Sequence, residues 1–112
     1  MPKTLQLPLK KKWFDMIKAG IKKEEYREMK QCWYKRLCRE QNPNQPWLNP
    51  MGGFYFEIRN DFDTLVFTLG YPKAGDKERR LEFKNPKIRI GTGKPEWGAE
   101  PGKLYFVITW EN

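Results

Sequence analysis

The feature that most constrains the fold of this chain is the alternation of apolar and polar residues in short segments. Leu5, Leu7 and Leu9 face one way while Thr4 and Gln6 face the other. This is the period of a β-strand with one buried face. The alternation recurs at residues 54–58, 65–69 and 81–90, and residues 104–110 are apolar on both faces. With no βαβ repetition, the pattern predicts an α+β fold built on a mostly antiparallel barrel that is either open or closed.

Two helices are predicted in the N-terminal half, where they would cover one end of the barrel. From Lys10 the period becomes helical, with Trp13, Met16 and Ile17 on one face, and Gly20 fits the left-handed position that ends a helix. Trp13 is expected in the core, and the alternative is a surface on which a base stacks. A second helix is predicted from Met29 to Glu40, with Trp33 and Leu37 packed on the sheet.

The connections between these elements contain turn-forming residues. Residues 41–53 hold three prolines, three asparagines and two glycines, which predicts a long loop in which Trp47 is buried. The pair Asn60-Asp61 predicts an antiparallel hairpin between residues 54–58 and 65–69. Asn85-Pro86 predicts a bend or bulge, and the strand 104–110 is expected inside the sheet.

Length and charge restrict the class of protein. The 112 residues are expected to form one domain, 1–112, with an aromatic core built from five Trp, seven Phe and five Tyr. Lys and Arg outnumber Asp and Glu by 22 to 14, for a formal charge of +8. Such an excess favours polyanions, with nucleic acid the first partner to consider. The alternative is a lysine-rich surface that only aids solubility.

Several chemistries are excluded by what the sequence lacks. The chain has no histidine and no serine, so imidazole-based triads and imidazole metal ligands are excluded, and no metal or cofactor is expected. Cys32 and Cys38 are expected to be reduced structural thiols. No apolar run reaches membrane-spanning length and no signal-peptide core is present, which predicts a cytoplasmic protein without membrane contact.

The densest group of reactive side chains lies between Gly20 and Arg27, in the sequence Gly-Ile-Lys-Lys-Glu-Glu-Tyr-Arg. In a strand, Glu25 and Arg27 share a face and can form a bidentate ion pair. Lys22 is an odd number of residues from both and would start on the opposite face. A twist, a bulge or an irregular exit from the helix is needed to bring it to them.

The spacing Gly-x-Lys-x-x-Glu-x-Arg resembles the signature of the ASCH family, the activating-signal-cointegrator homology domains. Four further segments are similar to family elements in the same order: Lys3 to Gly20, Phe62 to Tyr71, Gly91 to Trp97 and Leu104 to Ile108. The resemblance implies a PUA-like β-barrel with a cleft. In acetylcytidine amidohydrolases similar to this family the matching lysine is implicated in catalysis, with a threonine where this chain has Glu25. That nucleophilic mechanism is therefore not carried over.

A second polar segment runs from Gly91 to Gly98. It lacks the spacing of a nucleotide-hydrolysing P-loop, because Pro95 follows Lys94 where Ser or Thr would hold magnesium. Its glycines either turn a corner between strands or expose backbone amides to a phosphate. In the second case, Trp97 would offer a stacking surface to a base.

The leading hypothesis is an RNA- or nucleotide-binding domain in which Lys22, Glu25, Arg27 and Lys94 converge on one basic cleft with Trp97 at its wall. An alternative is a small hydrolase of a modified nucleoside or RNA, with Glu25 as general base and Lys22 stabilising the oxyanion. A module that recognises an acidic protein is a third possibility. The structural alternative is a partly buried Glu25–Arg27 pair with Lys22 as a surface charge. The sequence leaves open whether the protein is an enzyme, and its oligomeric state.

Overall fold

A computed structural model describes residues 3–30, 33, 36–40, 56–59 and 61–111. The predicted loop 41–53, with Trp47, lies outside the described residues. The elements in chain order are β1 (Thr4–Leu9), α1 (Lys11–Lys18), β2 (Glu25–Glu28), β3 (Cys38–Glu40), β4 (Phe56–Ile58), β5 (Thr64–Leu69), β6 (Arg80–Thr92), the 3-10 helix η1 (Pro95–Trp97) and β7 (Leu104–Glu111). No helix among them has the length and apolar composition that a membrane crossing requires.

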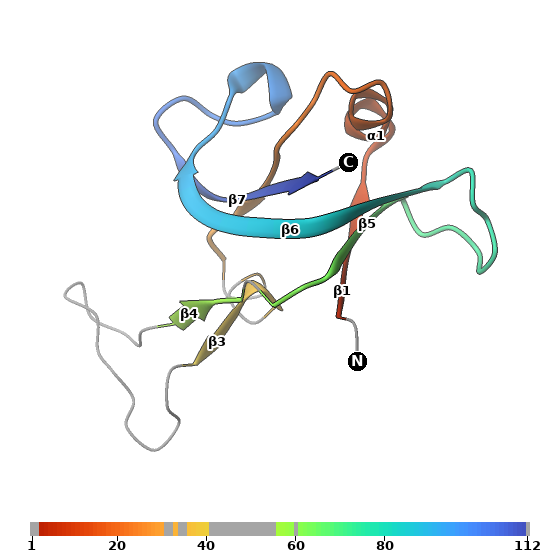
Figure 1. Cartoon of the computed structure of the whole chain (residues 1–112). Coiled ribbons are helices and arrows are strands. Elements are labelled where there is room, and N and C mark those ends of the chain that lie inside the picture. Colours follow the sequence, from red (N-terminus) through yellow and green to blue (C-terminus); the bar gives the residue numbers. More distant parts are fainter. Residues whose placement is uncertain (1–2, 31–32, 34–35, 41–55, 60, 112) are drawn as a thin grey trace.

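The fold is α+β and is built on a five-stranded sheet with the order β1-β5-β6-β7-β2. β1 pairs with β5 in parallel, and the other three pairings are antiparallel, so the predicted mostly antiparallel sheet is confirmed. The curved strand β6 runs through its middle (Figure 1). The sheet is not closed into a barrel, because β1 and β2 remain its two edges. Of the open or closed barrel that the sequence predicted, the closed form is therefore not present.

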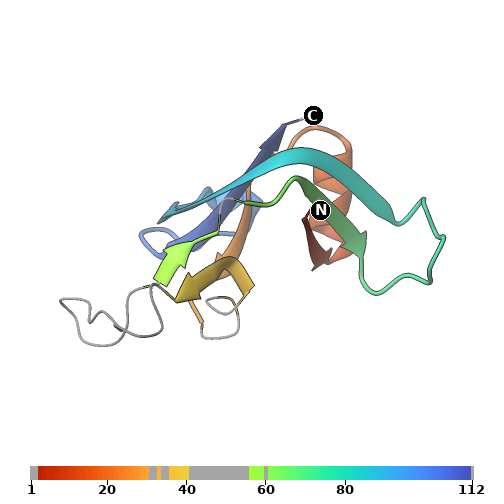
Figure 2. The same ribbon diagram turned by 60° about the horizontal axis from the view of Figure 1, so that its bottom comes forward.

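The predicted hairpin between residues 54–58 and 65–69 is also wrong. β4 pairs with β3 in a separate two-stranded sheet, at the lower left of Figures 1 and 2. β5 pairs with β1 on one side and with β6 on the other. Both edges of β5 are thus occupied, and no edge is left for β4.

The predicted second helix does not extend to Glu40. Trp33, Arg36 and Leu37 are helical, but Cys38–Glu40 is strand β3. Backbone pairing with β4 overrides the helical spacing of the side chains in these three residues. Residues 31–32 and 34–35 lie outside the described part of the chain, so α1 is the one helix that is described completely. Leu37 packs in the core as expected.

Two local predictions are confirmed at the turns. The register of β6 against β7 shifts between Lys84 and Lys87, and Asn85 has a φ of 49°. This is the bulge expected at Asn85-Pro86, and asparagine is one of the few residues that tolerate a positive φ. Gly20 has a φ of 79°, directly after α1.

The core consists of two groups of buried side chains on the two faces of β7. Phe106 and Ile108 belong to the larger group, while Tyr105 and Val107 belong to a smaller one. β7 is therefore buried on both faces, as its continuous apolar sequence predicted. The larger group also contains the buried thiol of Cys38, whose pKa is raised by burial. Leu37 and Phe62 belong to the same group, and its remaining large side chains come from β1, α1, β5 and β6: Leu5, Leu7, Leu9, Phe14, Ile17, Leu65, Phe67 and Ile88.

Candidate functional site

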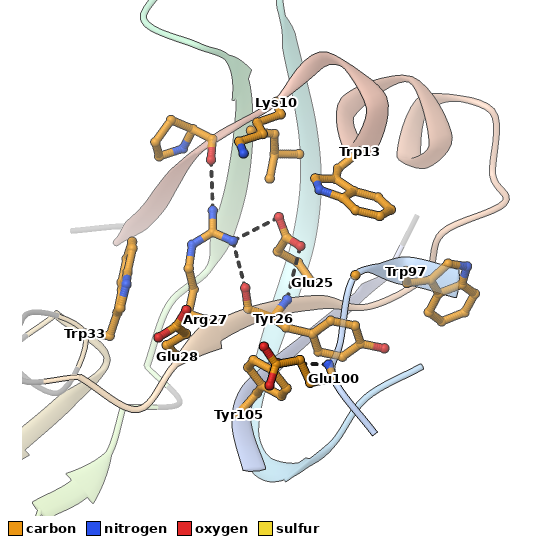
Figure 3. Close-up of a pocket in the computed structure, with 13 residues that line it drawn as sticks. Lys10, Trp13, Glu25, Tyr26, Arg27, Glu28, Trp33, Trp97, Glu100 and Tyr105 are labelled. Carbon is orange, nitrogen blue, oxygen red and sulfur yellow. Dashed lines mark hydrogen bonds and ion pairs between the residues drawn. The ribbon is translucent and has the colours of Figure 1, made fainter. Parts of the chain in front are cut away.

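A pocket of about 390 Å³ lies where the two edge strands of the sheet face each other. The end of β1 and the start of α1 form one side, and β2 forms the other (Figure 3). Five aromatic and five charged residues contribute to its walls. The lining residues are Pro8, Leu9, Lys10, Trp13, Glu25, Tyr26, Arg27, Glu28, Trp33, Trp97, Gly98, Glu100 and Tyr105.

The turn after α1 positions the first part of the segment Gly20 to Arg27, called the motif below. Gly20 N–H donates to the carbonyl of Ile17, and Ile21 N–H donates to that of Met16, both over 3.0 Å. With the positive φ of Gly20, this is a Schellman motif. Residues 21–24 are not part of a strand, and β2 begins only at Glu25. This irregular exit from the helix is what lets Lys22 reach Glu25.

Lys22 is a buried cation held by acceptors and aromatic rings. Its side chain is 0% exposed, and Nζ donates to Oε1 of Glu25 over 2.6 Å and to the carbonyl of Glu24 over 2.7 Å. Nζ also lies 5.3 Å from the ring centroid of Trp13 and 5.1 Å from that of Tyr26. Burial lowers the pKa of Lys22, and the Glu25 carboxylate opposes that shift.

Glu25 links Lys22 to Arg27. Its Oε1 accepts from Lys22 and from the backbone N–H of Tyr26, while its Oε2 lies 2.9 Å from Nη1 of Arg27. The predicted pair of Glu25 and Arg27 is present, but it is not bidentate because the second oxygen serves Lys22. Both carboxylate oxygens are therefore engaged within the protein.

Arg27 crosses the gap between the two edge strands. Its Nη1 donates to the carbonyl of Tyr26 in β2 and its Nη2 to the carbonyl of Pro8 in β1, each over 2.9 Å (Figure 3). The guanidinium also lies 5.1 Å from the ring of Trp33. Arg36, at the same distance from that ring, donates to the carbonyl of Gln6 over 2.7 Å. Two arginines thus cap alternate carbonyls along the free edge of β1.

The second polar segment meets the motif through Tyr26. The hydroxyl of Tyr26 donates to Glu24 and accepts the backbone N–H of Lys94, each over 2.9 Å. Burial raises the pKa of Tyr26 to about 12, and the hydrogen bond from Lys94 opposes the shift. A Cβ on Gly93 would lie 2.5 Å from Cζ of Tyr26, so glycine is required for this close approach. Gly93 is thus needed for packing against Tyr26, and the backbone N–H of Lys94 is already engaged within the protein.

Gly98 joins the same segment to α1. It has a φ of 103°, and a Cβ there would lie 2.9 Å from Cζ2 of Trp13. Trp13 therefore packs directly against the backbone that follows Trp97, and the two indoles lie on the same side of the pocket (Figure 3). Trp13, predicted in the core, is only half-buried and forms part of the wall.

Three of the five predicted site residues line the pocket: Glu25, Arg27 and Trp97. Lys22 does not, since its amine lies buried beneath the wall formed by Trp13, Glu25 and Tyr26. It is neither at the mouth of the cleft nor a surface charge. Lys94 does not line the pocket either: its Nζ lies 4.4 Å from the ring of Trp97. Its backbone, not its side chain, contacts the motif.

Ten of the thirteen lining residues were not among the predicted site residues. Tyr26 and Glu28 lie in or next to the motif, but strand alternation assigns them to the face opposite Glu25 and Arg27 and therefore does not mark them. Trp33, Glu100 and Tyr105 are brought in by tertiary packing, and no local signal marks them. Tyr105 is fixed there because its hydroxyl accepts the backbone N–H of Glu100 over 2.9 Å.

The charges of the pocket differ from the predicted basic cleft. Its lining holds three carboxylates, Glu25, Glu28 and Glu100, and two cations, Lys10 and Arg27. The negative charge of Glu25 is neutralised by its ion pairs with Lys22 and Arg27. The remaining charges of the lining are the carboxylates of Glu28 and Glu100 and the amine of Lys10. No group of three or more Cys, Asp or Glu side chains in the described part of the chain is arranged to hold a metal ion. The arrangement suits an uncharged, flat, hydrogen-bonding ligand.

No family model, curated protein or solved structure matches the chain.

Proposed function

We propose that this pocket binds a nucleotide-like ligand or an unpaired base of RNA. The observation that carries the proposal is that five aromatic side chains line the pocket beside charged groups able to form hydrogen bonds: Trp13, Trp33, Trp97, Tyr26 and Tyr105. Aromatic side chains are the surfaces on which proteins stack unpaired bases. The volume of about 390 Å³ lies in the range of small-molecule sites.

The resemblance to ASCH domains supports the same proposal. Arg27 connects the two edge strands of the sheet through its side chain. A PUA-like barrel whose edges are joined by side chains, and not by backbone pairing, would have the same feature. The formal charge of +8 favours a polyanionic partner. We also propose that the protein acts in the cytoplasm.

Hydrolysis is the second candidate function, and one observation favours it. Lys22 is a buried lysine with a lowered pKa in contact with a carboxylate that lines a pocket, a combination common at catalytic sites. However, both oxygens of Glu25 are engaged and the Lys22 side chain is 0% exposed. In this arrangement the Lys22 amine does not reach the pocket and the Glu25 carboxylate is held in two ion pairs, so we place binding first.

Tryptophan fluorescence and calorimetry with ribonucleotides and short RNA at low salt test the proposal. Binding should quench the indoles, and Trp97→Ala should weaken it by about 1 to 3 kcal/mol, the usual loss for one stacked base. Trp97→Phe keeps a stacking ring and should retain most of the affinity even if Trp97→Ala is poorly folded. Tyr71→Ala is the control, because Tyr71 is 92% exposed and does not line the pocket.

The absence of affinity for any nucleotide or RNA in the wild type would refute the proposal. So would equal affinity of Trp97→Ala and the wild type. Turnover of a modified nucleoside that Glu25→Gln abolishes, with binding retained, would instead support the hydrolase.

A further inference from the structure

The pocket lining carries charges of both signs, with the carboxylates Glu25, Glu28 and Glu100 beside the cations Lys10 and Arg27. Glu28 and Glu100 are exposed at its edge: the carboxylate of Glu100 has no hydrogen bond or ion pair within the described residues, and Glu28 contacts Lys30 at 3.3 Å and Lys103 at 3.8 Å. The donors of Arg27 are largely engaged by Glu25, Tyr26 and Pro8. A phosphate placed inside would meet these carboxylates, and of the two lining cations only Lys10 has no acidic partner within the described residues.

Two lysines lie just outside, on the indoles of one wall. Lys12 Nζ is 4.7 Å from the ring of Trp13, and Lys94 Nζ is 4.4 Å from the ring of Trp97. Both lysines are exposed, neither lines the pocket, and neither pairs with an acidic group in the part of the chain that the structure describes. Because Trp13 packs against Gly98, the two cations belong to one side of the rim.

We infer that the site takes in one amino-bearing base of a single-stranded nucleic acid and leaves its phosphates outside, on Lys12 and Lys94. This rests on the proposed function and specifies its ligand. A base brings a flat, uncharged ring to the aromatic walls. Carboxylates only accept hydrogen bonds, so Glu100 and Glu28 select bases that present an amino group at their edge. The phosphates then lie against the exposed Lys12 and Lys94. This attraction depends on salt, because phosphate binding releases counterions.

The first experiment measures affinities of uridine pentamers whose central base is adenine, hypoxanthine or absent, as RNA and as DNA. The adenine strand should bind at least about tenfold tighter than the abasic strand, because stacking is lost in the latter. It should also bind several-fold tighter than the hypoxanthine strand, which presents a carbonyl where adenine has an amino group. In Glu100→Gln the adenine-to-hypoxanthine ratio should fall toward one, since an amide can pair with either group.

The second experiment tests the outer lysines with matched charges. In Lys12→Gln/Lys94→Gln, the slope of log affinity against log salt should become shallower by about 1.4, or about 0.7 for each lost phosphate contact with a single strand. Lys73→Gln/Lys77→Gln has the same net charge, lies in the exposed β5–β6 loop and should keep the wild-type slope. Adenosine monophosphate should bind more weakly than the pentamer.

The outcomes separate this inference from the proposed function. If no base, nucleotide or strand binds, both fail. Equal affinity of adenosine monophosphate and the adenine pentamer, or the same salt slope for Lys12→Gln/Lys94→Gln and Lys73→Gln/Lys77→Gln, would rule out the binding of a strand. Either result would leave the binding of a base in the pocket intact. An abasic strand that binds as tightly as the adenine strand rules out base insertion, and equal affinity for adenine and hypoxanthine rules out the amino selection.

Discussion

The guanidinium of Arg27 donates a hydrogen bond to the carbonyl of Pro8 over 2.9 Å, and so connects two edge strands that no backbone pairing joins. Proline has no N–H to offer, which suits the free edge of β1. Arg36 caps the carbonyl of Gln6 on the same edge. Side chains therefore connect the two edges of the sheet. The pocket lies in the gap between β1 and β2, which backbone pairing of these strands would close.

Arg27→Ala should lower the free energy of unfolding by about 3 kcal/mol, because it breaks a largely buried ion pair and leaves the carbonyl of Pro8 without its donor. Arg27→Lys keeps the charge but cannot hold Glu25, Tyr26 and Pro8 together, so its loss should be intermediate. Urea unfolding measures both. Arg79→Ala removes a 60% exposed partner of Asp76 and should change stability by less than about 0.5 kcal/mol. Equal effects of Arg27→Ala and Arg79→Ala would contradict the role of Arg27.

The contact between Lys22 and Glu25 should be strongly coupled. In a double-mutant cycle of Lys22→Met and Glu25→Gln, we expect a coupling of about 2 kcal/mol, since each single variant leaves an uncompensated buried group. The same cycle on Lys11 and Asp15, an i,i+4 pair at 77% and 51% exposure, should give about 0.3 to 0.5 kcal/mol. Similar couplings at the two pairs would show that burial of Lys22 has no energetic consequence.

Two glycines of the site should differ in what an added methyl group costs. A Cβ at Gly20 meets nothing within 4 Å, so Gly20→Ala should cost only the left-handed backbone penalty, about 1 kcal/mol. Gly93→Ala places a Cβ 2.5 Å from the Tyr26 ring and should cost about 2 to 3 kcal/mol as overpacking. Thermal unfolding compares the two. A smaller loss for Gly93→Ala than for Gly20→Ala would show that Tyr26 moves freely.

Tyr26 should make stability fall at alkaline pH. Its folded pKa of about 12 exceeds the ordinary 10.0, so the unfolded state loses the proton first and stability decreases as pH rises from about 10 to about 12. In Tyr26→Phe this part of the decrease should disappear, although the variant also loses the hydrogen bonds to Glu24 and Lys94. Urea unfolding at a series of pH values measures the difference between the two proteins. Parallel curves for the two proteins would rule out the raised pKa.

Local sequence determined those features that depend on neighbouring residues. The period of two placed β1, β5 and β6, and a continuous apolar run placed β7. Gly20 ended the helix because few other residues adopt a positive φ at low cost. Asn85-Pro86 marked the bulge for a similar reason. The pairing of Glu25 with Arg27 followed from strand alternation alone, since residues two apart share a face.

Tertiary structure decided which segments meet. The hydrophobic period and the turn residues do not encode long-range pairing. They therefore did not predict that β5 pairs with β1 in parallel. Nor did they predict that Cys38–Glu40, despite its helical spacing, forms a strand with β4. Lys22 is buried because the chain's exit from α1 turns its amine under Trp13 and Tyr26. Trp33 and Tyr105 reach the pocket only because the sheet curves until its two edges face each other. The sequence supplied the motif and its charges, while the curvature of the sheet determined which of them face a ligand and which are enclosed.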